Sequence, residues 1–243
     1  MAVDYSGHAA DYDRARGDET TDREFWLRGL VEVGRIHPGE RVLDLGAGTG
    51  RFAKLIAETN RVVALDPSEE MLRVARTKGP FECVRGDGRR LPFRADAFDI
   101  AVVVMVLHHL GDYAAALRDV ARVARRVVVA TSDMDARRLG ILEEAFPSLL
   151  AIDRRRFPPV AAVVAGLRAA GFGNVVVEER PYFRTLTTEQ QLDRVRHRYL
   201  STFDLLPPGE YERGLQFLEI ELPRRYGNRF DVTATFTFIG ATK

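Results

Sequence analysis

The residues best suited to bind a ligand lie in the stretch Arg41 to Phe52, where an acid comes shortly before three closely spaced glycines. Val42 to Leu45 has the pattern of a short apolar strand, and it runs into the turn Gly46-Ala47-Gly48-Thr49-Gly50, which opens a helix. Glycines let a ligand approach the backbone closely, and the N–H groups at a helix N-terminus point toward it. The stretch therefore predicts a turn that holds a ligand.

The glycine spacing and the acid Asp44 indicate which kind of ligand the turn holds. The dinucleotide fingerprint G-x-G-x-x-G leaves room for a pyrophosphate, but here the third glycine comes one residue early. A carboxylate beside the turn also suits a cation better than a phosphate. A second acid, Asp66, follows the strand-like segment Arg61 to Leu65, twenty-two positions after Asp44. At that distance an acid at a strand end can accept hydrogen bonds from both hydroxyls of a ribose.

The segment Val42 to Gly50 resembles the first motif of the class I, Rossmann-like S-adenosylmethionine-dependent methyltransferases. The resemblance implies S-adenosyl-L-methionine as the cofactor, with the Asp44 carboxylate facing its ammonium group and the turn supplying backbone contacts. The cofactor-binding residues implied in this motif are Asp44, Gly46, Ala47, Gly48 and Gly50. The alternative is that Asp44 only caps the glycine turn through its side chain.

Two further segments extend the resemblance along the cofactor. Pro67 to Leu72 is similar to the family's second motif, which implies that Asp66 and Pro67 lie at the ribose and that Met71 packs on the adenine. A methionine in a helix is more often part of the core, so that reading also stays open. After the next predicted strand, the resemblance assigns the adenine amino group to Asp87, beside Gly88. The alternative for Asp87 is a turn residue between two glycines.

The N-terminal region, about residues 1–37, is polar and helix-like, and it contains a Y-D-x-x-R pattern at Tyr12, Asp13 and Arg16. Many relatives cover their cofactor with a similar segment. The resemblance implies that Arg16 pairs with the cofactor carboxylate and that Tyr12 closes over the site. The alternative is a surface helix whose residues contact no ligand.

The segment Met105 to Leu110 follows the fourth predicted strand, where the methyl acceptor is expected. It lacks the N/D-P-P-Y/F motif of some nitrogen methyltransferases and resembles small-molecule enzymes in which one or two histidines follow the strand. His109 and His108 are therefore candidate general bases, and packing residues in the cofactor wall are the alternative. Met105 is expected against the cofactor. Some quinone O-methyltransferases hold a metal here with carboxylates, which Met105 and His108 replace, so no metal site is expected.

Strand and helix patterns alternate through the first half of the chain, which predicts a parallel α/β sheet with ligand sites at the strand carboxyl ends. Two late strands, Asn174 to Glu179 and Arg229 to Ala241, fit an antiparallel hairpin at the sheet edge. The full expectation is a single domain, residues 1–243, with a seven-stranded mostly parallel sheet, helices on both faces and an antiparallel last strand. Two arginine-rich insertions, 132–157 and 184–228, are expected to form a helical lid. In and immediately before the second, the expected acceptor wall is Tyr182, Phe183, Arg184, Arg194, His197, Arg198, Tyr199 and Phe203.

Composition narrows the class of protein. The formal net charge is +1, from 36 basic and 35 acidic residues, so no overall field attracts nucleic acid or a membrane surface. The single cysteine, Cys83, excludes an internal disulfide and a cysteine-rich metal site. The polar start of the sequence lacks the features of a signal or transit peptide, and the longest apolar run, Ile100 to Leu107, is too short to span a bilayer. A cytoplasmic location is expected.

These observations predict methyl transfer from S-adenosylmethionine to an O, N or C atom of a small molecule, by in-line displacement assisted by positioning. A tRNA or other nucleic-acid methyltransferase is the first alternative, because Arg154 to Arg156 and Arg194 to Arg198 can form local basic patches. An NAD-dependent oxidoreductase is disfavoured by the glycine spacing. A cofactor-binding protein without transferase activity is the alternative from a different class.

Overall fold

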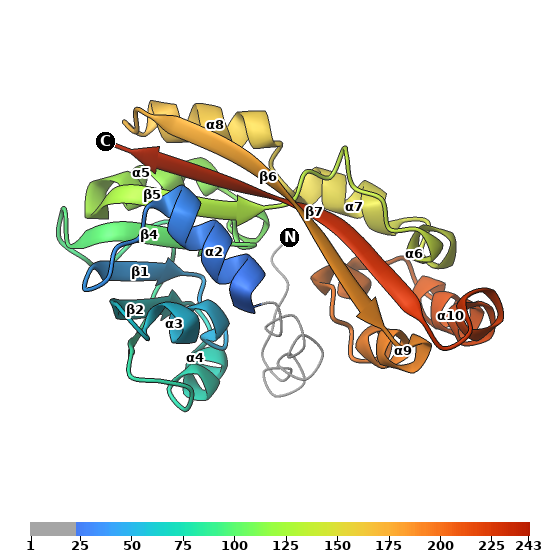
Figure 1. Ribbon diagram of the computed structural model, residues 1–243. Coiled ribbons are helices and arrows are strands. Elements are labelled where there is room, and N and C mark those ends of the chain that lie inside the picture. Colours follow the sequence, from blue (N-terminus) through green and yellow to red (C-terminus); the bar gives the residue numbers. More distant parts are fainter. Residues whose placement is uncertain (1–22) are drawn as a thin grey trace.

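The computed structural model describes residues 23–243, and it is built on one seven-stranded sheet with the order β3-β2-β1-β4-β5-β7-β6 (Figure 1). Neighbours β3, β2, β1, β4 and β5 pair in parallel, whereas β7 pairs antiparallel with both β5 and β6. The expected fold, with an antiparallel last strand, is confirmed. The strands are β1 (Arg41–Leu45), β2 (Arg61–Asp66), β3 (Glu82–Arg85), β4 (Phe98–Val104), β5 (Ala124–Thr131), β6 (Val175–Leu186) and β7 (Phe230–Thr242).

Helices cover both faces of the sheet because its central strands are apolar on both sides. In β4, Ala101 and Val103 pack into the core cluster shared with α5 and α8. Ile100 and Val102 pack into the opposite cluster, which contains Trp26 of α2. The helices that flank the sheet are α2 (Arg23–Gly34), α3 (Arg51–Ile56), α4 (Glu69–Ala75), α5 (Tyr113–Val123) and α8 (Val160–Ala169), and a 3₁₀ turn, η2 (Leu107–His109), follows β4.

The hairpin of β6 and β7 extends well past the sheet. Its pairing runs from Val175 opposite Ala241 to Leu186 opposite Phe230, whereas β5 pairs with β7 only as far as Thr237. The sequence predicted that β6 ends at Glu179, but the strand continues to Leu186. The extension holds because β7 supplies a pairing partner along its whole length, although this part of β6 lies outside the core sheet.

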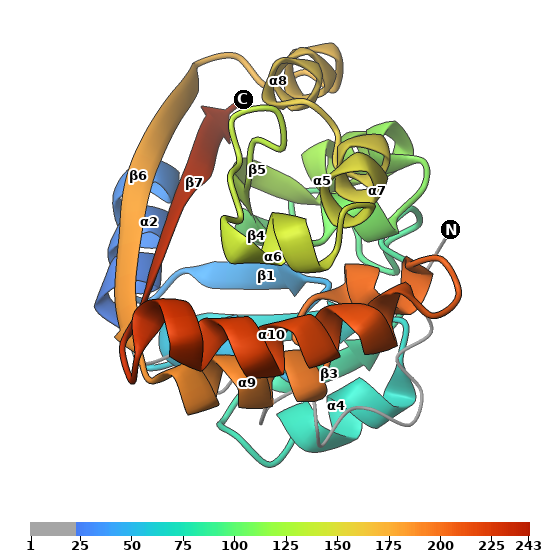
Figure 2. The same ribbon diagram turned by 90° about the vertical axis from the view of Figure 1, so that its right-hand side faces the viewer.

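The free end of this hairpin carries a helical lobe, formed by α6 (Ile141–Ala145), α7 (Leu149–Arg156), α9 (Thr188–Arg196), η3 (Ser201–Leu205) and α10 (Glu210–Tyr226). The lobe has a core of its own, in which Phe146, Phe203, Leu218 and Leu222 are buried together. A capping box of Thr187 and Gln190 begins α9. Figure 2 shows α9 and α10 in front of the sheet, beyond the carboxyl ends of its parallel strands. The two predicted insertions therefore meet in one lobe.

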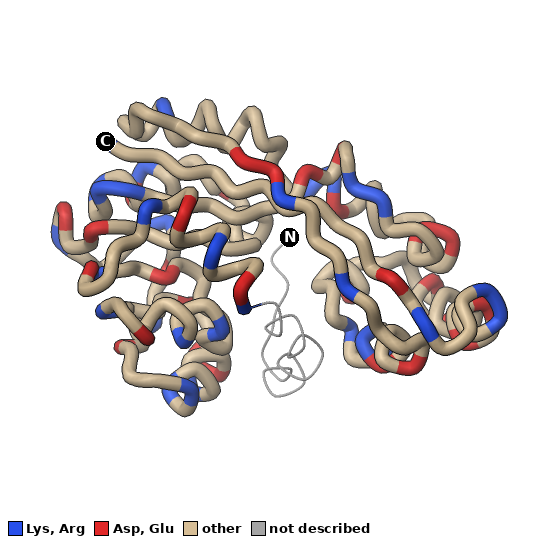
Figure 3. The backbone as a smooth tube through the Cα atoms, in the orientation of Figure 1, with Lys and Arg blue, Asp and Glu red and all other residues tan. Residues whose placement is uncertain are grey.

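Basic and acidic positions are mixed over both the sheet and the lobe in the view of Figure 3. No helix within residues 23–243 is long and apolar enough to cross a membrane.

Candidate active site

A cavity of about 1290 Å³ lies between the carboxyl ends of the strands and the helical lobe. Pockets for single small ligands are typically on the order of 300–1,000 Å³, so this one has room for a cofactor and an acceptor together. The residues predicted for the site that line it are Gly46, Ala47, Gly48, Asp66, Pro67, Met71, Asp87, Gly88, Met105, His108 and His109. Their roles stay predictions. Asp44 and Gly50 do not line the cavity, and the predictions for Tyr12 and Arg16 lie outside the described residues.

The glycine turn follows β1 and is held to the neighbouring strand. The N–H groups of Gly46 and Ala47 both donate to the carbonyl oxygen of Leu65, at 2.8 and 3.0 Å. Gly46 has a φ of +71°, and a Cβ atom there would lie 2.2 Å from Cγ2 of Val106. Only glycine fits this backbone conformation and this close approach. The turn thus lies directly against the segment that follows β4.

Asp44 lies behind the glycine turn, where it is 1% exposed. Its carboxylate accepts a hydrogen bond from the backbone N–H of Ala53 in the first turn of α3, and its Oδ2 is buried without a hydrogen-bond partner. The pKa of Asp44 is raised from 3.8 to about 7, mainly by burial; the N–H of Ala53 opposes the rise, and the charge of Asp66 adds to it. The side chain thus caps the first turn of α3 and keeps one oxygen without a hydrogen-bond partner, and its role toward a cofactor stays a prediction.

Asp66 ends β2 and is almost buried, at 9% exposure. One oxygen, Oδ2, accepts from the N–H of Gly48 at 2.9 Å, and Oδ1 accepts from the N–H of Ser68, also at 2.9 Å. Burial raises the pKa of Asp66, and the two N–H donors oppose that rise by stabilising the ionised form. These bonds fix the carboxylate in the cavity wall, and each oxygen keeps a second lone pair that can accept from a ligand hydroxyl.

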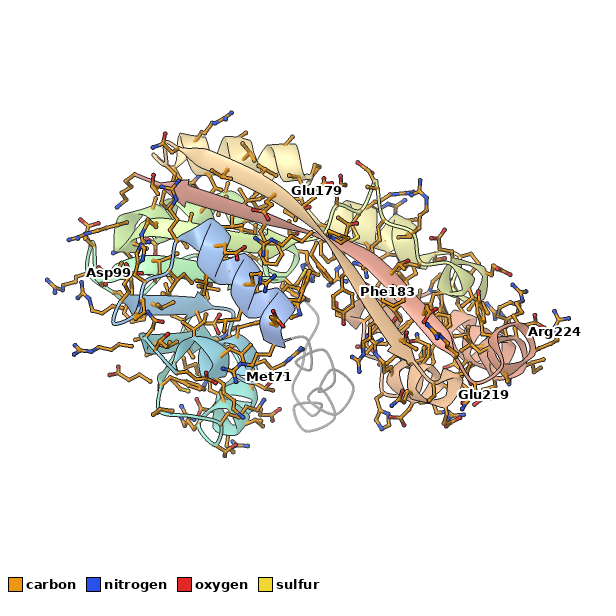
Figure 4. All side chains as sticks on the ribbon, viewed as in Figure 1. Met71, Asp99, Glu179, Phe183, Glu219 and Arg224 are labelled. Carbon is orange, nitrogen blue, oxygen red and sulfur yellow. The ribbon has the colours of Figure 1, made fainter. Side chains whose placement is uncertain are left out.

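Asp87 lines the cavity from the loop after β3, where it is engaged by a neighbour. The Arg89 guanidinium donates to both carboxylate oxygens, at 2.7 to 3.1 Å, and holds the pKa of Asp87 below its usual range. Met71 is buried yet also lines the cavity, and Figure 4 shows it on the side of the sheet that faces the lobe. Asp99 lies at the opposite end in the same view, where it accepts from the N–H of Arg41 at 2.9 Å.

The end of β4 turns sharply toward the cavity. Met105 has a φ of +51°, a left-handed conformation that costs a residue other than glycine roughly 1–2 kcal/mol. Its N–H still donates to the carbonyl of Ala130 in β5, at 2.8 Å. The strained turn directs the 3₁₀ turn η2, with both histidines, along the wall of the cavity.

The two histidines contact the helical lobe through α7. The His108 ring stacks on Phe157, with centroids 3.8 Å apart and planes at 12°, and it also lies against His109 at 3.9 Å. Nδ1 of His109 lies 3.5 Å from Nη2 of Arg156. This side of the cavity is therefore closed by residues of the first insertion.

Arg156 belongs to a buried polar cluster that the sequence did not predict. Its guanidinium donates to the hydroxyl oxygens of Thr202, at 2.8 Å, and Ser201, at 3.2 Å. Thr202 in turn donates to Asp153, whose pKa is raised by burial. Arg137 also lines the cavity and donates to Ser132 at 3.2 Å. We call the set Arg137, Asp153, Arg156, Ser201 and Thr202 the arginine wall. The arginine-rich composition of the first insertion was its only signal in the sequence.

The expected acceptor wall in the second insertion largely points elsewhere. Of its residues only Tyr199 lines the cavity. Tyr182, Phe183 and Arg184 belong to β6, and Phe183 is 60% exposed. Within the described part of the chain, no group of three or more His, Cys, Asp and Glu residues is placed to hold a metal ion.

The sequence has relatives among characterised families. Residues 43–128 match the family model described as a methyltransferase domain. The ubiquinone/menaquinone biosynthesis C-methyltransferase UbiE of Shewanella sp. (strain ANA-3) is 38% identical over 112 residues, which cover 42% of this chain and 45% of that protein. The chain therefore matches less than half the length of such curated relatives.

Solved structures share the architecture at lower sequence identity. A putative methyltransferase from an antibiotic biosynthesis pathway of Anabaena variabilis superposes with a TM-score of 0.73 at 22% identity, covering 90% of this chain and 97% of that one. Phosphoethanolamine N-methyltransferase 2 of Haemonchus contortus, in complex with S-adenosyl-L-methionine, has a TM-score of 0.63 at 17% identity and covers 97% of this chain and 56% of that one. At these identities the likeness shows a common fold.

Proposed function

Because this chain belongs to the class I S-adenosylmethionine-dependent methyltransferases, we propose that it transfers the cofactor's methyl group to an O, N or C atom of a small molecule bound in the same cavity. When bound, S-adenosylmethionine supplies a methyl group on a sulfonium, which a nucleophile attacks in line. The observation that carries the proposal is the joint placement of the glycine turn and Asp66 at the carboxyl ends of β1 and β2. The other residues that line the cavity would bind, orient and shield the reactants.

The donor set on the sheet side fits the three parts of the cofactor. Asp66 offers two fixed carboxylate oxygens with free lone pairs, which suit a ribose. The turn at Gly46 to Gly48 offers closely approachable backbone, and the ionised form of Asp44 just behind it favours a cationic amino acid end. Asp87 and Met71 line the remaining side, where an adenine would be held. A cation bound near Asp44 would also stabilise its ionised carboxylate, whose Oδ2 has no hydrogen-bond partner.

The shape of the cavity favours a small acceptor. The lobe faces the strand ends, so that Phe157, Leu200 and Phe236 form apolar walls around the same space as the glycine turn. Apolar walls exclude water and orient an acceptor, and this contributes to the rate through proximity. A nucleic-acid methyltransferase would instead be expected to show a broad basic face, whereas basic and acidic positions are interspersed along the backbone drawn in Figure 3.

His109 lies beside a cation, which shapes its role. Nδ1 of its imidazole lies 3.5 Å from Nη2 of Arg156, and a guanidinium only donates hydrogen bonds, so this ring nitrogen faces a donor rather than a group that it could deprotonate. We therefore propose that His109 orients the acceptor and that in-line positioning supplies more of the rate than proton abstraction. The ring stack of His108 on Phe157 likewise suggests a structural part for His108.

The test is transfer of an isotopically labelled methyl group. The full chain is incubated with labelled S-adenosylmethionine and an extract of the source organism. Low-mass products are then separated and their masses measured by mass spectrometry. Label in a small molecule that depends on the wild-type chain and is lost with Asp66→Asn supports the proposal, while Asp231→Asn, an exposed carboxyl on β7, is the matched control. Label in RNA supports the nucleic-acid alternative. A chain that binds the cofactor and transfers no label is a binding protein.

A further inference from the structure

The helical lobe contributes an excess of positive charge to the cavity. The cavity residues between positions 137 and 159, together with Tyr199 to Thr202, include four arginines, Arg137, Arg154, Arg155 and Arg156, and one acid, Asp153. On the opposite, sheet side the arginines Arg51, Arg85 and Arg89 face four acids, Asp66, Glu69, Glu70 and Asp87. The imbalance is therefore confined to the side where the acceptor binds.

Two of these arginines share one buried carboxylate. The side chains of Arg156 and Asp153 are 8% and 7% exposed, with Nη1 and Oδ1 3.6 Å apart. Arg137 also acts on Asp153 through its charge. Two guanidinium groups against one carboxylate leave an excess positive charge in the arginine wall, and burying an uncompensated charge is costly. An anion bound beside the wall would compensate that charge.

The hydrogen bonds of the arginine wall leave two guanidinium N–H donors without a partner. The Nε atoms of Arg137 and Arg156 are both buried without a partner. Ser201 accepts from Arg156 through its oxygen and lines the cavity, so its own O–H can donate into it. Apart from Asp153, Arg156 contacts the hydroxyls of Thr202 and Ser201 and the imidazole of His109, which bring no negative charge.

We propose that the methyl acceptor carries a carboxylate or phosphate group and that Arg137, Arg156 and Ser201 bind this group at the lobe side of the cavity. The inference rests on the proposed function, since it names the class of acceptor for that site. Guanidinium groups and hydroxyls recognise both oxyanions by charge-assisted hydrogen bonds. Because Arg156 contacts His109, an anion held there extends toward the end of β4, where the acceptor atom must lie.

The test is a calorimetric titration of the full chain with three phenyl probes: benzoate, phenyl phosphate and benzamide, the neutral isostere of benzoate. Each titration is made with the protein saturated in S-adenosylhomocysteine. We expect at least one of the anions to bind ten or more times as tightly as benzamide, and the stronger of the two identifies the oxyanion. Anions that bind no better than benzamide overturn the proposal.

Variants distinguish anion binding by Arg156 from a purely structural role of this residue. Arg156→Met is expected to weaken anion binding at least tenfold, with affinities for benzamide and S-adenosylhomocysteine within threefold of wild type. Arg224→Met is the matched control, because Arg224 is an exposed arginine of α10, paired with Glu221, at the outer end of the lobe in Figure 4. Equal anion affinity in the two variants overturns the proposal, and so does a loss confined to S-adenosylhomocysteine.

Two outcomes need separate readings. Should Arg156→Met not fold, Arg137→Met takes its place, and the comparison of benzoate with benzamide on the wild type stands without any variant. Should S-adenosylhomocysteine not bind, the proposed function fails, and the anion titrations are repeated without it. A preference for anions then persists only if the arginine wall is an anion site in its own right.

Discussion

Asp44 provides the most specific physical prediction, because its burial opposes folding whenever it is ionised. Burial raises the pKa of Asp44 from 3.8 to about 7, and each unit corresponds to about 1.4 kcal/mol. The shift of about three units therefore means that the ionised carboxylate lowers the free energy of unfolding by about 4 kcal/mol relative to the protonated form. Replacement with asparagine removes that charge.

The sign follows from proton linkage. Between about pH 4 and pH 7 the folded chain holds the Asp44 proton and the unfolded chain has lost it, so the contribution of Asp44 to stability falls as pH rises through that window and is constant above it. In Asp44→Asn the amide oxygen can keep the bond from Ala53, but its NH₂ takes the place of Oδ2, which has no partner. An unsatisfied buried donor costs about 1–3 kcal/mol. We expect Asp44→Asn to exceed wild type in stability by about 1–3 kcal/mol at pH 8 and to equal it or fall below it at pH 5.

Urea denaturation of the cofactor-free chain at pH 5 and pH 8 measures this difference. Asp231→Asn is the control, because the pKa of this exposed carboxyl is lowered by the Thr185 hydroxyl and Arg229, so its pH dependence runs the other way. The same Asp44→Asn chain is expected to lose affinity for S-adenosylhomocysteine at least tenfold. A variant that is equally destabilised at both pH values would show that the buried carboxylate carries no penalty, and the reasoning would be wrong.

Three further substitutions test the parts of the site. Gly46→Ala is expected to cost about 2–4 kcal/mol, since a positive φ and an overlap with a neighbouring side chain add together; Gly39→Ala, with positive φ but open space around it, should cost only about 1–2 kcal/mol in the same urea titration. Asp66→Asn should lower stability by about 1–3 kcal/mol, because an amide cannot accept from both N–H donors, and cofactor affinity measured by calorimetry should fall at least tenfold. Asp153→Asn should cost about 3–5 kcal/mol by thermal denaturation, since it leaves Arg156 buried beside no carboxylate; an unchanged melting temperature would contradict this.

Much of the fold could be predicted because its signals are local. The apolar run of β4 indicates burial on both faces within a few residues. The closely spaced glycines after β1 indicate a turn by their residue type. Both the seven strands and the antiparallel last strand follow from such patterns. The end of β6 could not be predicted, because its last residues are held by pairing with β7, about fifty positions away in the sequence.

The lobe side of the cavity depends on contacts between distant segments. Arg156 meets Thr202 and Ser201 about 45 positions further along the chain, and it meets His109 about 47 positions earlier. A run of three arginines in a helix gives no indication of which one is buried. The sheet side of the cavity was easier to predict from the sequence. Asp66 and the glycine turn lie at adjacent strand ends, and this position follows from the parallel topology.

The most direct test of cofactor binding in this cavity is a titration of the wild-type chain with S-adenosylhomocysteine, monitored by the fluorescence of Trp26. This residue is the sole tryptophan of the sequence, and it lines the cavity. We expect a saturable, single-site change in fluorescence. Asp66→Asn should weaken the affinity at least tenfold, and Asp231→Asn should leave it unaffected. A folded wild-type chain that shows no saturable change, together with no heat of binding by calorimetry, would contradict it.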